Sequence, residues 1–498
     1  MNFLKKTKIF LLNGLLLTCT SLALKSISMF FGVYISNKIG AEAVGVYQLI
    51  MSVYLLFTTF ACSGINLATS RIVSEQMAYN NEKDIPSAVK KCIIYCIVMG
   101  SFACIVLFVS SSYISTYWLH GKVSSLPLKI IAISLPFLSI SSCINGYFTA
   151  VRRVKKSAIS QVFEQILKIG LITFLFNYFS PSGIEKTCIY LVFGSTLSEI
   201  LSCFLIYIFY KKDSSKGEIN RSSGYTRQIL RITIPIAATS YIRSGLSTLK
   251  QILIPLRLEK SGISCETALS QYGIINGMAM PLIMFPCTFI YSFSSLLIPE
   301  FSYLNAKKNY GKINFAIDKI LKFCFIFSFL IMGIFWCFSK ELSTNIYNET
   351  SVAGFIKILS PLIVLMYVDN IVDSILKGLD KQVSVMGINI LDLVTSISFI
   401  YYLLPIKGIN GYIIVLFISE FLNGVLSLIL LIKETKLRIN FTNWFFKPIL
   451  SIFIVNIIFK NYNCNSIFDL IIQIFIFCIC YFLCIFLFKG LVKEDLKL

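Results

Sequence analysis

The sequence has little charge for its length. Of its 498 residues only 14% are charged, whereas soluble proteins carry about 25%, and 56% are hydrophobic. The mean hydropathy is +0.78. Because the apolar surplus extends from end to end, the composition excludes a soluble protein of about three domains. It indicates a chain that is embedded in lipid.

Residues for metal or redox chemistry are also scarce or badly placed. The single histidine, His120, has no nearby ligand set, which argues against a His-based metal site and a His-dependent transferase. The 16 cysteines lie mostly in apolar segments and form no CxxC pair, so we expect no disulfide framework. No catalytic constellation is visible. The sequence therefore predicts a protein that is not an enzyme and that binds no cofactor or metal.

Long apolar runs make up most of the chain. A helix needs about 20 apolar residues to span a bilayer, and the sequence contains fourteen such segments. The runs are continuous rather than alternating, which favours helices over the strands of a membrane barrel. The predicted fold is an all-α integral membrane protein with about 14 transmembrane helices. The predicted spans are 9–35, 44–68, 87–110, 126–150, 157–179, 187–210, 229–256, 271–298, 316–338, 353–376, 384–404, 410–432, 447–460 and 467–488.

The formal net charge of +21 is explained by where the basic residues lie. If the N-terminus is inside, 31 of the 45 Lys and Arg residues fall in inner segments and nine in outer loops. Short cytoplasmic loops are enriched in Lys and Arg in this way. We therefore predict a multi-pass protein of the cell membrane with both termini cytoplasmic. Its basic inner face favours contact with anionic membrane lipids, and we expect no nucleic-acid partner.

Part of the sequence repeats at an offset of 225 residues. Thirteen identities fall among residues 24–80, including Lys25 with Lys250 and Glu75 with Glu300. Charged residues are costly in or beside a membrane, so these two matches carry the most weight. The repeat predicts two parallel six-helix bundles that face each other across a cleft. The predicted domains are an N-terminal bundle (1–210), a cytoplasmic linker (211–228), a C-terminal bundle (229–432), and a cytoplasmic loop with helices thirteen and fourteen (433–498).

Three basic residues lie inside predicted helices. Lys25 is in the first helix, and Arg243 and Lys250 are seven residues apart in the seventh, hence on nearly one face. A cation within the membrane usually faces a partner or a wet cavity. The three residues therefore predict a substrate-binding site for an anion such as phosphate or pyrophosphate. The alternative is that both lysines extend to the outer headgroups.

Carboxylates gather in predicted helices of the C-terminal half. They can form a coupling-ion site for sodium or protons, or they can serve as structural hydrogen-bonding groups between helices, and the sequence favours neither interpretation. Two further glutamates lie at cytoplasmic helix ends, where we expect gate residues. The four carboxylates are Asp369, Asp373, Asp392 and Glu420, and the two gate candidates are Glu75 and Glu300.

Two stretches of the sequence resemble a known family. Residues 40–49, GAEAVGVYQL, and residues 64–75, GINLATSRIVSE, resemble the stage V sporulation protein B family. That family belongs to the polysaccharide-export branch of the multidrug/oligosaccharidyl-lipid/polysaccharide (MOP) exporter superfamily. The resemblance implies a flippase that moves an undecaprenyl-pyrophosphate-linked saccharide, a lipid II-like precursor of the spore cortex, by alternating access. It also implies that Lys25 and Arg243 are cavity cations, that cell-wall synthases are partners, and that the forespore membrane is the location.

Two other functions stay open at this point. An ion-coupled multidrug exporter would need an acidic cavity, which the carboxylates from Asp369 to Glu420 keep open, although the basic first and seventh helices argue against it. A non-transporting scaffold subunit of the cell-wall machinery would make the charges of the cavity dispensable.

Overall fold

The chain folds into helices that form two compact units. The computed structural model describes residues 2–79, 81–179, 181, 183–214, 224–437, 442–459 and 466–491, and none of these residues lies in a β-strand. The first unit comprises Met1–Phe31 and Glu42–Leu253, and the second comprises Gly32–Ala41 and Ile254–Leu498. The predicted all-α class is confirmed.

Many of these helices are suited to a membrane. Nine helices of the described residues are long and apolar enough to span a bilayer, or up to eleven if two bent pairs each count as one span. The predicted count of fourteen is not confirmed. The longest helices, α1 (Asn2–Cys62) and α16 (Gln382–Thr435), are interrupted at Gly40 and Gly408, where φ is 77° and 55°. Glycine adopts positive φ without steric cost, which allows the chain to turn at these two positions. Both breaks fall between predicted spans.

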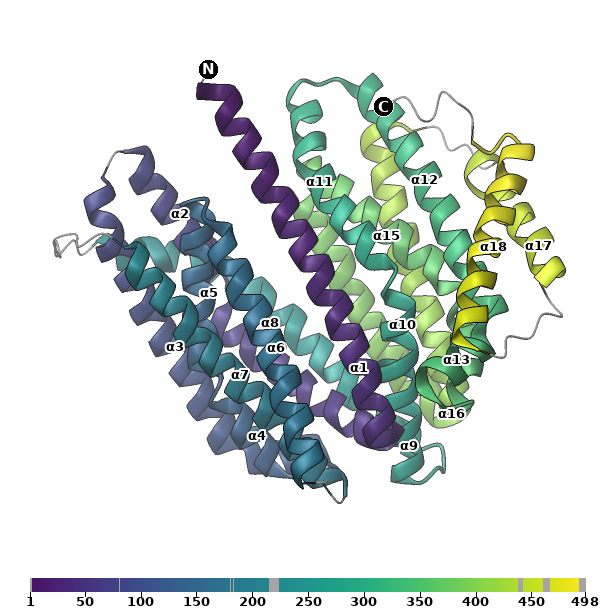
Figure 1. Ribbon diagram of the computed structural model, residues 1–498, viewed down its shortest axis with the longest axis horizontal. Helices are drawn as coiled ribbons and strands as arrows, with labels where there is room; N and C mark the ends of the chain where they lie inside the picture. The colour runs from purple at the N-terminus through teal and green to yellow at the C-terminus, as the bar shows by residue number, and fades with distance from the viewer. Residues whose placement is uncertain are drawn as a thin grey trace. The chain divides into compact units, whose positions relative to one another are not determined.

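The first unit contains α1, apart from its residues Gly32–Ala41, and the helices α2 to α8 (Figure 1). Helix α5 packs on α2, α3 and α7, and α6 packs on α7. A Cβ atom on Gly100 of α3 would lie 2.7 Å from the Cα atom of Pro136, so only glycine allows α3 and α5 to approach this closely. The helices after α1 are α2 (Ile65–Ala78), α3 (Ile85–Tyr113), α4 (Ser125–Ala132), α5 (Leu135–Ala150), α6 (Val154–Phe179), α7 (Ile184–Asp213) and α8 (Gly224–Glu259), whose last residues belong to the second unit.

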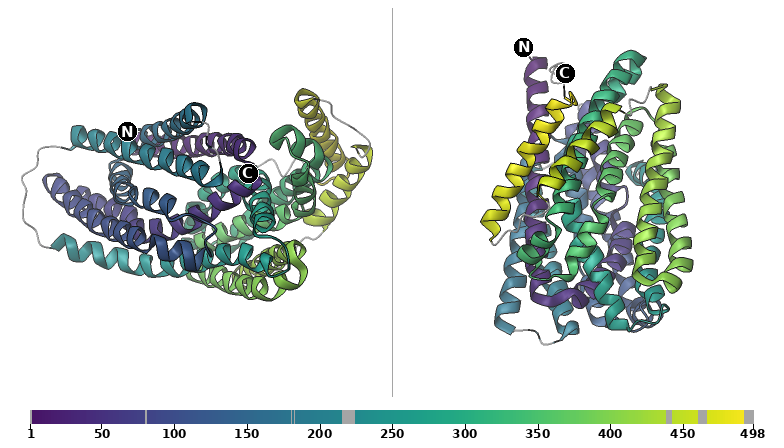
Figure 2. Two further views of the ribbon diagram at one scale, coloured as in Figure 1. Left: turned by 90° about the horizontal axis from the view of Figure 1, so that it is seen from below. Right: turned by 90° about the vertical axis from the view of Figure 1, so that its right-hand side faces the viewer.

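The second unit is built around α15, which packs against α11, α12 and α16 (Figure 2). A Cβ atom on Gly378 would lie 2.7 Å from the Phe301 Cβ atom, so α15 and α11 also meet at a glycine. The last two helices pack on each other and on α12. Besides α16, the α-helices are α9 (Cys265–Gly273), α10 (Met280–Met284), α11 (Cys287–Ala306), α12 (Tyr310–Cys337), α13 (Ser339–Tyr347), α14 (Ser351–Leu359), α15 (Leu362–Gly378), α17 (Lys447–Phe459) and α18 (Ile467–Leu487).

Two predicted spans of the second unit are bent rather than straight. The segment Cys265–Met284 and α11 meet at 58°, and α14 and α15 meet at 51°. Pro286 lies in the first break and Pro361 in the second. Proline has no backbone N–H and clashes with the preceding turn, which accounts for a bend at each position.

The repeat seen in the sequence is also present in the helix boundaries. In the first copy, α1 is interrupted at Gly40 and α2 begins at Ile65. In the second copy, α9 begins at Cys265 and α11 begins at Cys287. With the offset of 225 subtracted, these two starts correspond to positions 40 and 62, within three residues of the first copy. The two copies therefore share their helical breaks as well as their identities.

The predicted six-helix domains stay a prediction. Residues 215–223 of the predicted linker lie outside the described residues, as do residues 438–441 of the predicted loop after residue 432. The division by contacts places most of α8, up to Leu253, in the first unit.

Candidate functional site

The three predicted substrate-binding cations all belong to the first unit. Lys25 lies on α1, and Arg243 and Lys250 lie on α8. Lys25 and Arg243 are exposed, and Lys250 is half-buried. Their convergence on one cavity stays a prediction.

The packing of α8 shows which way Arg243 and Lys250 point. Ser244 and Thr248 hydrogen-bond to the part of α1 after Gly40, at 3.1 Å from Thr59 Oγ1 and 3.0 Å from the Ser52 carbonyl oxygen. Successive helical residues are rotated by about 100°, so Arg243 and Lys250 lie about 100–160° around α8 from these contacts. The two cations therefore point away from this part of α1.

The predicted carboxylates of the second unit are held mainly by neutral donors. Asn423 Nδ2 donates to Asp369 Oδ2 at 3.0 Å, and Ser419 Oγ donates to Asp392 Oδ1 at 2.5 Å. Asp373 accepts hydrogen bonds from Asn389 and Ser427 and lies 3.8 Å from the Lys377 ammonium. These contacts join α15 to both parts of α16. Hydrogen bonds of this kind between helices are what a structural role requires. The choice between a coupling-ion role and a structural role stays open.

One carboxylate oxygen of this cluster lacks a partner. Asp369 Oδ1 is buried and accepts no hydrogen bond from the described residues. An unsatisfied buried acceptor is costly, and a bound proton or cation would remove the cost. Asp369 is therefore the carboxylate of this cluster that best fits an ion.

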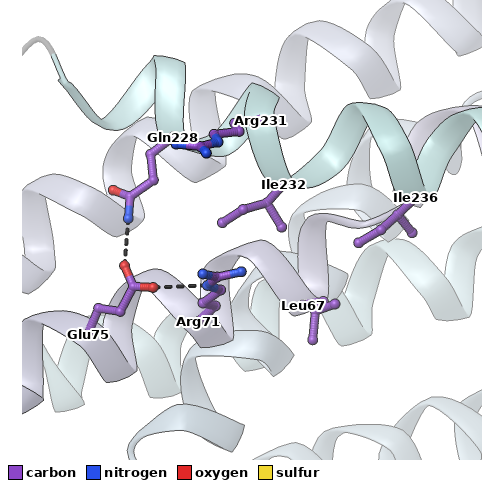
Figure 3. A pocket seen from close by; sticks show the side chains of 7 residues that line it. All are labelled: Leu67, Arg71, Glu75, Gln228, Arg231, Ile232 and Ile236. Carbon is purple, nitrogen blue, oxygen red and sulfur yellow. Dashed lines mark hydrogen bonds and ion pairs between the residues drawn. The ribbon is translucent and has the colours of Figure 1, made fainter. Parts of the chain in front are cut away.

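Glu75, a predicted gate residue, lines a cavity of about 660 Å³ between α2 and α8 (Figure 3). Arg71 Nε donates to Glu75 Oε1 at 2.9 Å, and Gln228 Nε2 donates to Glu75 Oε2 at 2.6 Å. Glu75 therefore connects the two helices. Arg231 of α8 also lines the cavity, and its apolar walls are Leu67, Ile232 and Ile236.

Glu300, the counterpart of Glu75 in the repeat, is exposed at the middle of α11. Within the described residues it makes no ion pair, whereas Glu75 is held by two donors. The gate role of both glutamates stays a prediction.

Sequence reasoning missed Glu199 of α7. Tyr54 Oη, from α1, donates to Glu199 Oε2 at 2.6 Å and lies 2.9 Å from Ser134 Oγ. The Lys168 ammonium on α6 interacts electrostatically with Glu199 and with Glu164. The only local signal was the pairing of Glu164 with Lys168 at a spacing of four residues. Glu199 and its partners come from different helices, and no sequence spacing connects them.

Among the residues that the structure describes, no group of three or more His, Cys, Asp or Glu side chains is arranged to hold a metal ion.

Comparison with solved structures identifies the class of proteins that share this fold. A solved structure of the lipid II flippase MurJ in an inward closed conformation matches with a TM-score of 0.73 at 13% identity, covering 95% of this chain and 98% of that one. An inward-facing MATE family multidrug transporter of the MOP superfamily matches with a TM-score of 0.68 at 13% identity, over 83% and 95%. The fold is thus that of the multi-pass helical transporters of the MOP superfamily.

Sequence comparison defines the family. The model of the family described as polysaccharide biosynthesis protein matches residues 10–305, more than half of the chain, and the MatE model matches residues 261–402. The chain belongs to the polysaccharide biosynthesis protein family. It is 25% identical to stage V sporulation protein B of Bacillus subtilis (strain 168), over 81% of this chain and 79% of that protein. It is 23% identical to the lipid II flippase MurJ of the same organism, over 72% and 70%. The resemblance drawn from residues 40–49 and 64–75 is confirmed.

Proposed function

We propose that this protein is a flippase that translocates an undecaprenyl-pyrophosphate-linked saccharide across the cytoplasmic membrane. The substrate is a lipid II-like peptidoglycan precursor for the spore cortex. The observation that carries the proposal is the similarity to stage V sporulation protein B and to MurJ over more than two thirds of each relative. Three cations on α1 and α8 support an anionic substrate, and the hydrogen bonds from α8 to the part of α1 after Gly40 come from Ser244 and Thr248.

Translocation in this proposal needs no covalent chemistry. The pyrophosphate and its sugars enter a cleft from the cytoplasm while the polyprenyl tail stays in lipid. Lys25, Arg243 and Lys250 replace part of the hydration that the pyrophosphate loses. An inside-negative potential favours outward movement by about 2.3 kcal/mol per charge per 100 mV. Alternating access then exposes the headgroup on the outer side.

The direct test is a headgroup-accessibility assay with lipid II in vesicles that contain the purified protein. Arg243→Ala removes a group able to form paired charged hydrogen bonds, so we expect transport to fall about 100-fold, which corresponds to about 2.7 kcal/mol. Lys25→Ala and Lys250→Ala each remove one point charge and should reduce transport about tenfold. Arg227→Ala, an exposed residue of the same helix, is the matched control. Wild-type transport by Arg243→Ala would refute the cation site, and no transport by the wild type would refute the flippase.

One observation keeps an ion-coupled multidrug exporter as a second candidate. The MatE model matches residues 261–402, which contain Asp369, Asp373 and Asp392. A drug-sensitivity assay separates the two functions, because an exporter should lower the sensitivity of a host strain to cationic drugs and a lipid II flippase should not.

The location and the partners are part of the same proposal. We place both termini in the cytoplasm and the protein in the forespore membrane during sporulation, with cell-wall synthases as partners. Reporter fusions at each terminus test the orientation, and fluorescence microscopy of sporulating cells tests the location. A non-transporting scaffold would instead keep cortex synthesis intact in the Arg243→Ala variant.

A further inference from the structure

The cavity between α2 and α8 contains more hydrogen-bond donors than acceptors. Both oxygens of Glu75 are used, one by Arg71 Nε and the other by Gln228 Nε2. Arg231 is exposed and makes no hydrogen bond or ion pair within the described residues. Each guanidinium carries five N–H donors, so most of the donors of the two arginines remain available. Two arginines and one glutamate leave the cavity with one net positive charge.

The contacts of Arg71 orient its guanidinium toward an anion. Its Nε atom is held by Glu75, and Glu75 is held in turn by Gln228 from the facing helix. The two terminal nitrogens of Arg71 are then free to form the paired contacts that suit a phosphate group. In Figure 3 the side chain of Arg71 lies between Glu75 and Leu67, facing the helix that carries Arg231.

The cavity has a rigid framework. On the side away from the arginines, Ile65 and Ile72 of α2 share a buried core with Tyr225 and Ile229 of α8. This apolar contact packs the two helices against each other beside the cavity. Less binding free energy is then lost in ordering the site.

The rest of the cavity is apolar. Leu67 is 58% exposed, and Ile232 and Ile236 are half-buried, so hydrocarbon surface adjoins the two guanidinium groups. A free inorganic anion would leave this surface unused. A lipid with a phosphate next to its chain would occupy both parts.

We propose that this cavity is a docking site for the phosphate end of a polyprenyl phosphate or pyrophosphate lipid, with Arg71 and Arg231 as its ligands and Glu75 as the residue that positions Arg71. The proposal rests on the proposed flippase function. It adds a binding site to the one predicted at Lys25, Arg243 and Lys250, with none of its residues in common.

Binding of undecaprenyl pyrophosphate to the purified full-length protein tests the proposal, with native mass spectrometry as the measurement. The measurement uses the Arg243→Ala background, so that binding at the other predicted site does not mask the effect. Arg231→Gln should weaken binding about tenfold, because it removes one charged phosphate contact. Arg227→Gln is the matched control, because it removes the same charge from an exposed residue one turn away that does not line the cavity. It should leave the affinity unchanged.

Two further ligands identify the source of the phosphate. Phosphatidylglycerol and inorganic pyrophosphate are titrated in the same way. Equal effects of Arg231→Gln and Arg227→Gln on undecaprenyl pyrophosphate would overturn the proposal. So would an effect of Arg231→Gln that is confined to phosphatidylglycerol, since the site would then bind membrane phospholipid. Arg71→Gln is a second variant at the same site, and an effect like that of Arg231→Gln would support the proposal.

Transport separates this proposal from the flippase itself. In the otherwise wild-type protein, Arg231→Gln should raise the KM for lipid II about tenfold and leave kcat unchanged, since the residue acts in docking. If Arg231→Gln transports lipid II as the wild type does, with an unchanged KM, the docking-site proposal is refuted and the flippase proposal stands. If the wild-type protein transports no lipid II, the flippase proposal is refuted, whatever the binding measurements show.

Discussion

Asp213 of the first unit and Asp369 of the second are carboxylates in different surroundings. In the first unit, Asp213 is bonded by Arg153 and Lys156. In the second unit, Asp369 and Asp392 accept hydrogen bonds from an amide and a hydroxyl. A carboxylate next to a cation is already compensated, whereas one with neutral donors still attracts a cation or a proton. Asp213 is therefore compensated within the protein, whereas one oxygen of Asp369 has no donor among the described residues.

The largest expected effect on stability comes from replacing Asp213, the carboxylate of the first unit that is bonded by two cations. The side chain of Asp213 is only 3% exposed, and it also accepts a hydrogen bond from Tyr147 Oη at 3.2 Å. Asp213→Asn keeps the shape but leaves two cations without their counter-ion. We expect the free energy of unfolding to fall by about 2–3 kcal/mol, measured by thermal denaturation in detergent.

A surface ion pair of the second unit is the control for Asp213. Glu434 lies 2.8 Å from the Lys381 ammonium, and both side chains are about one third exposed, at 29% and 37%. Glu434→Gln should cost less than about 1 kcal/mol. Equal losses in the two variants would show that burial of the carboxylate does not distinguish the two units.

The second prediction concerns Asp369, the carboxylate with an oxygen that lacks a partner. Asp369→Asn preserves the volume and removes the charge. If the cluster binds a coupling ion, transport should lose its dependence on a sodium or proton gradient, with a fall of about tenfold or more under that gradient. The measurement is lipid II accessibility in vesicles with and without each gradient. A variant that keeps its gradient dependence and only melts earlier would assign the cluster a structural role.

The sequence predicted the all-α class and some helix boundaries but not the number of spans or the contacts between helices. The predicted span 467–488 agrees with α18 to within one residue, because one long apolar run defines it. Arg231 falls at the start of the predicted span 229–256, and no sequence spacing relates it to Arg71, whereas in the structure α8 begins at Gly224 and both arginines line one cavity. Glu199 was missed because Tyr54 and Lys168 approach it from other helices. Apolar composition locates a helix, whereas the partner of a charge depends on how helices pack.

The smallest expected effect compares one buried serine from each unit. In the first unit Ser139 Oγ donates to the Ala61 carbonyl oxygen at 2.9 Å, and in the second Ser419 Oγ donates to Asp392 Oδ1 at 2.5 Å. Hydrogen bonds between membrane helices contribute about 0.6 kcal/mol on average and at most about 1.7 kcal/mol. Ser139→Ala should lie near the average, because its acceptor is an uncharged carbonyl group.

Ser419→Ala should lie near the upper value, because it removes the donor to a carboxylate. It also removes the acceptor of Ser396 Oγ, which donates to Ser419 Oγ at 2.9 Å. Thermal denaturation of both variants in the same detergent gives the difference. A gap of zero would mean that Asp392 is satisfied by other donors, and the contrast between the units would then rest on Asp369 alone.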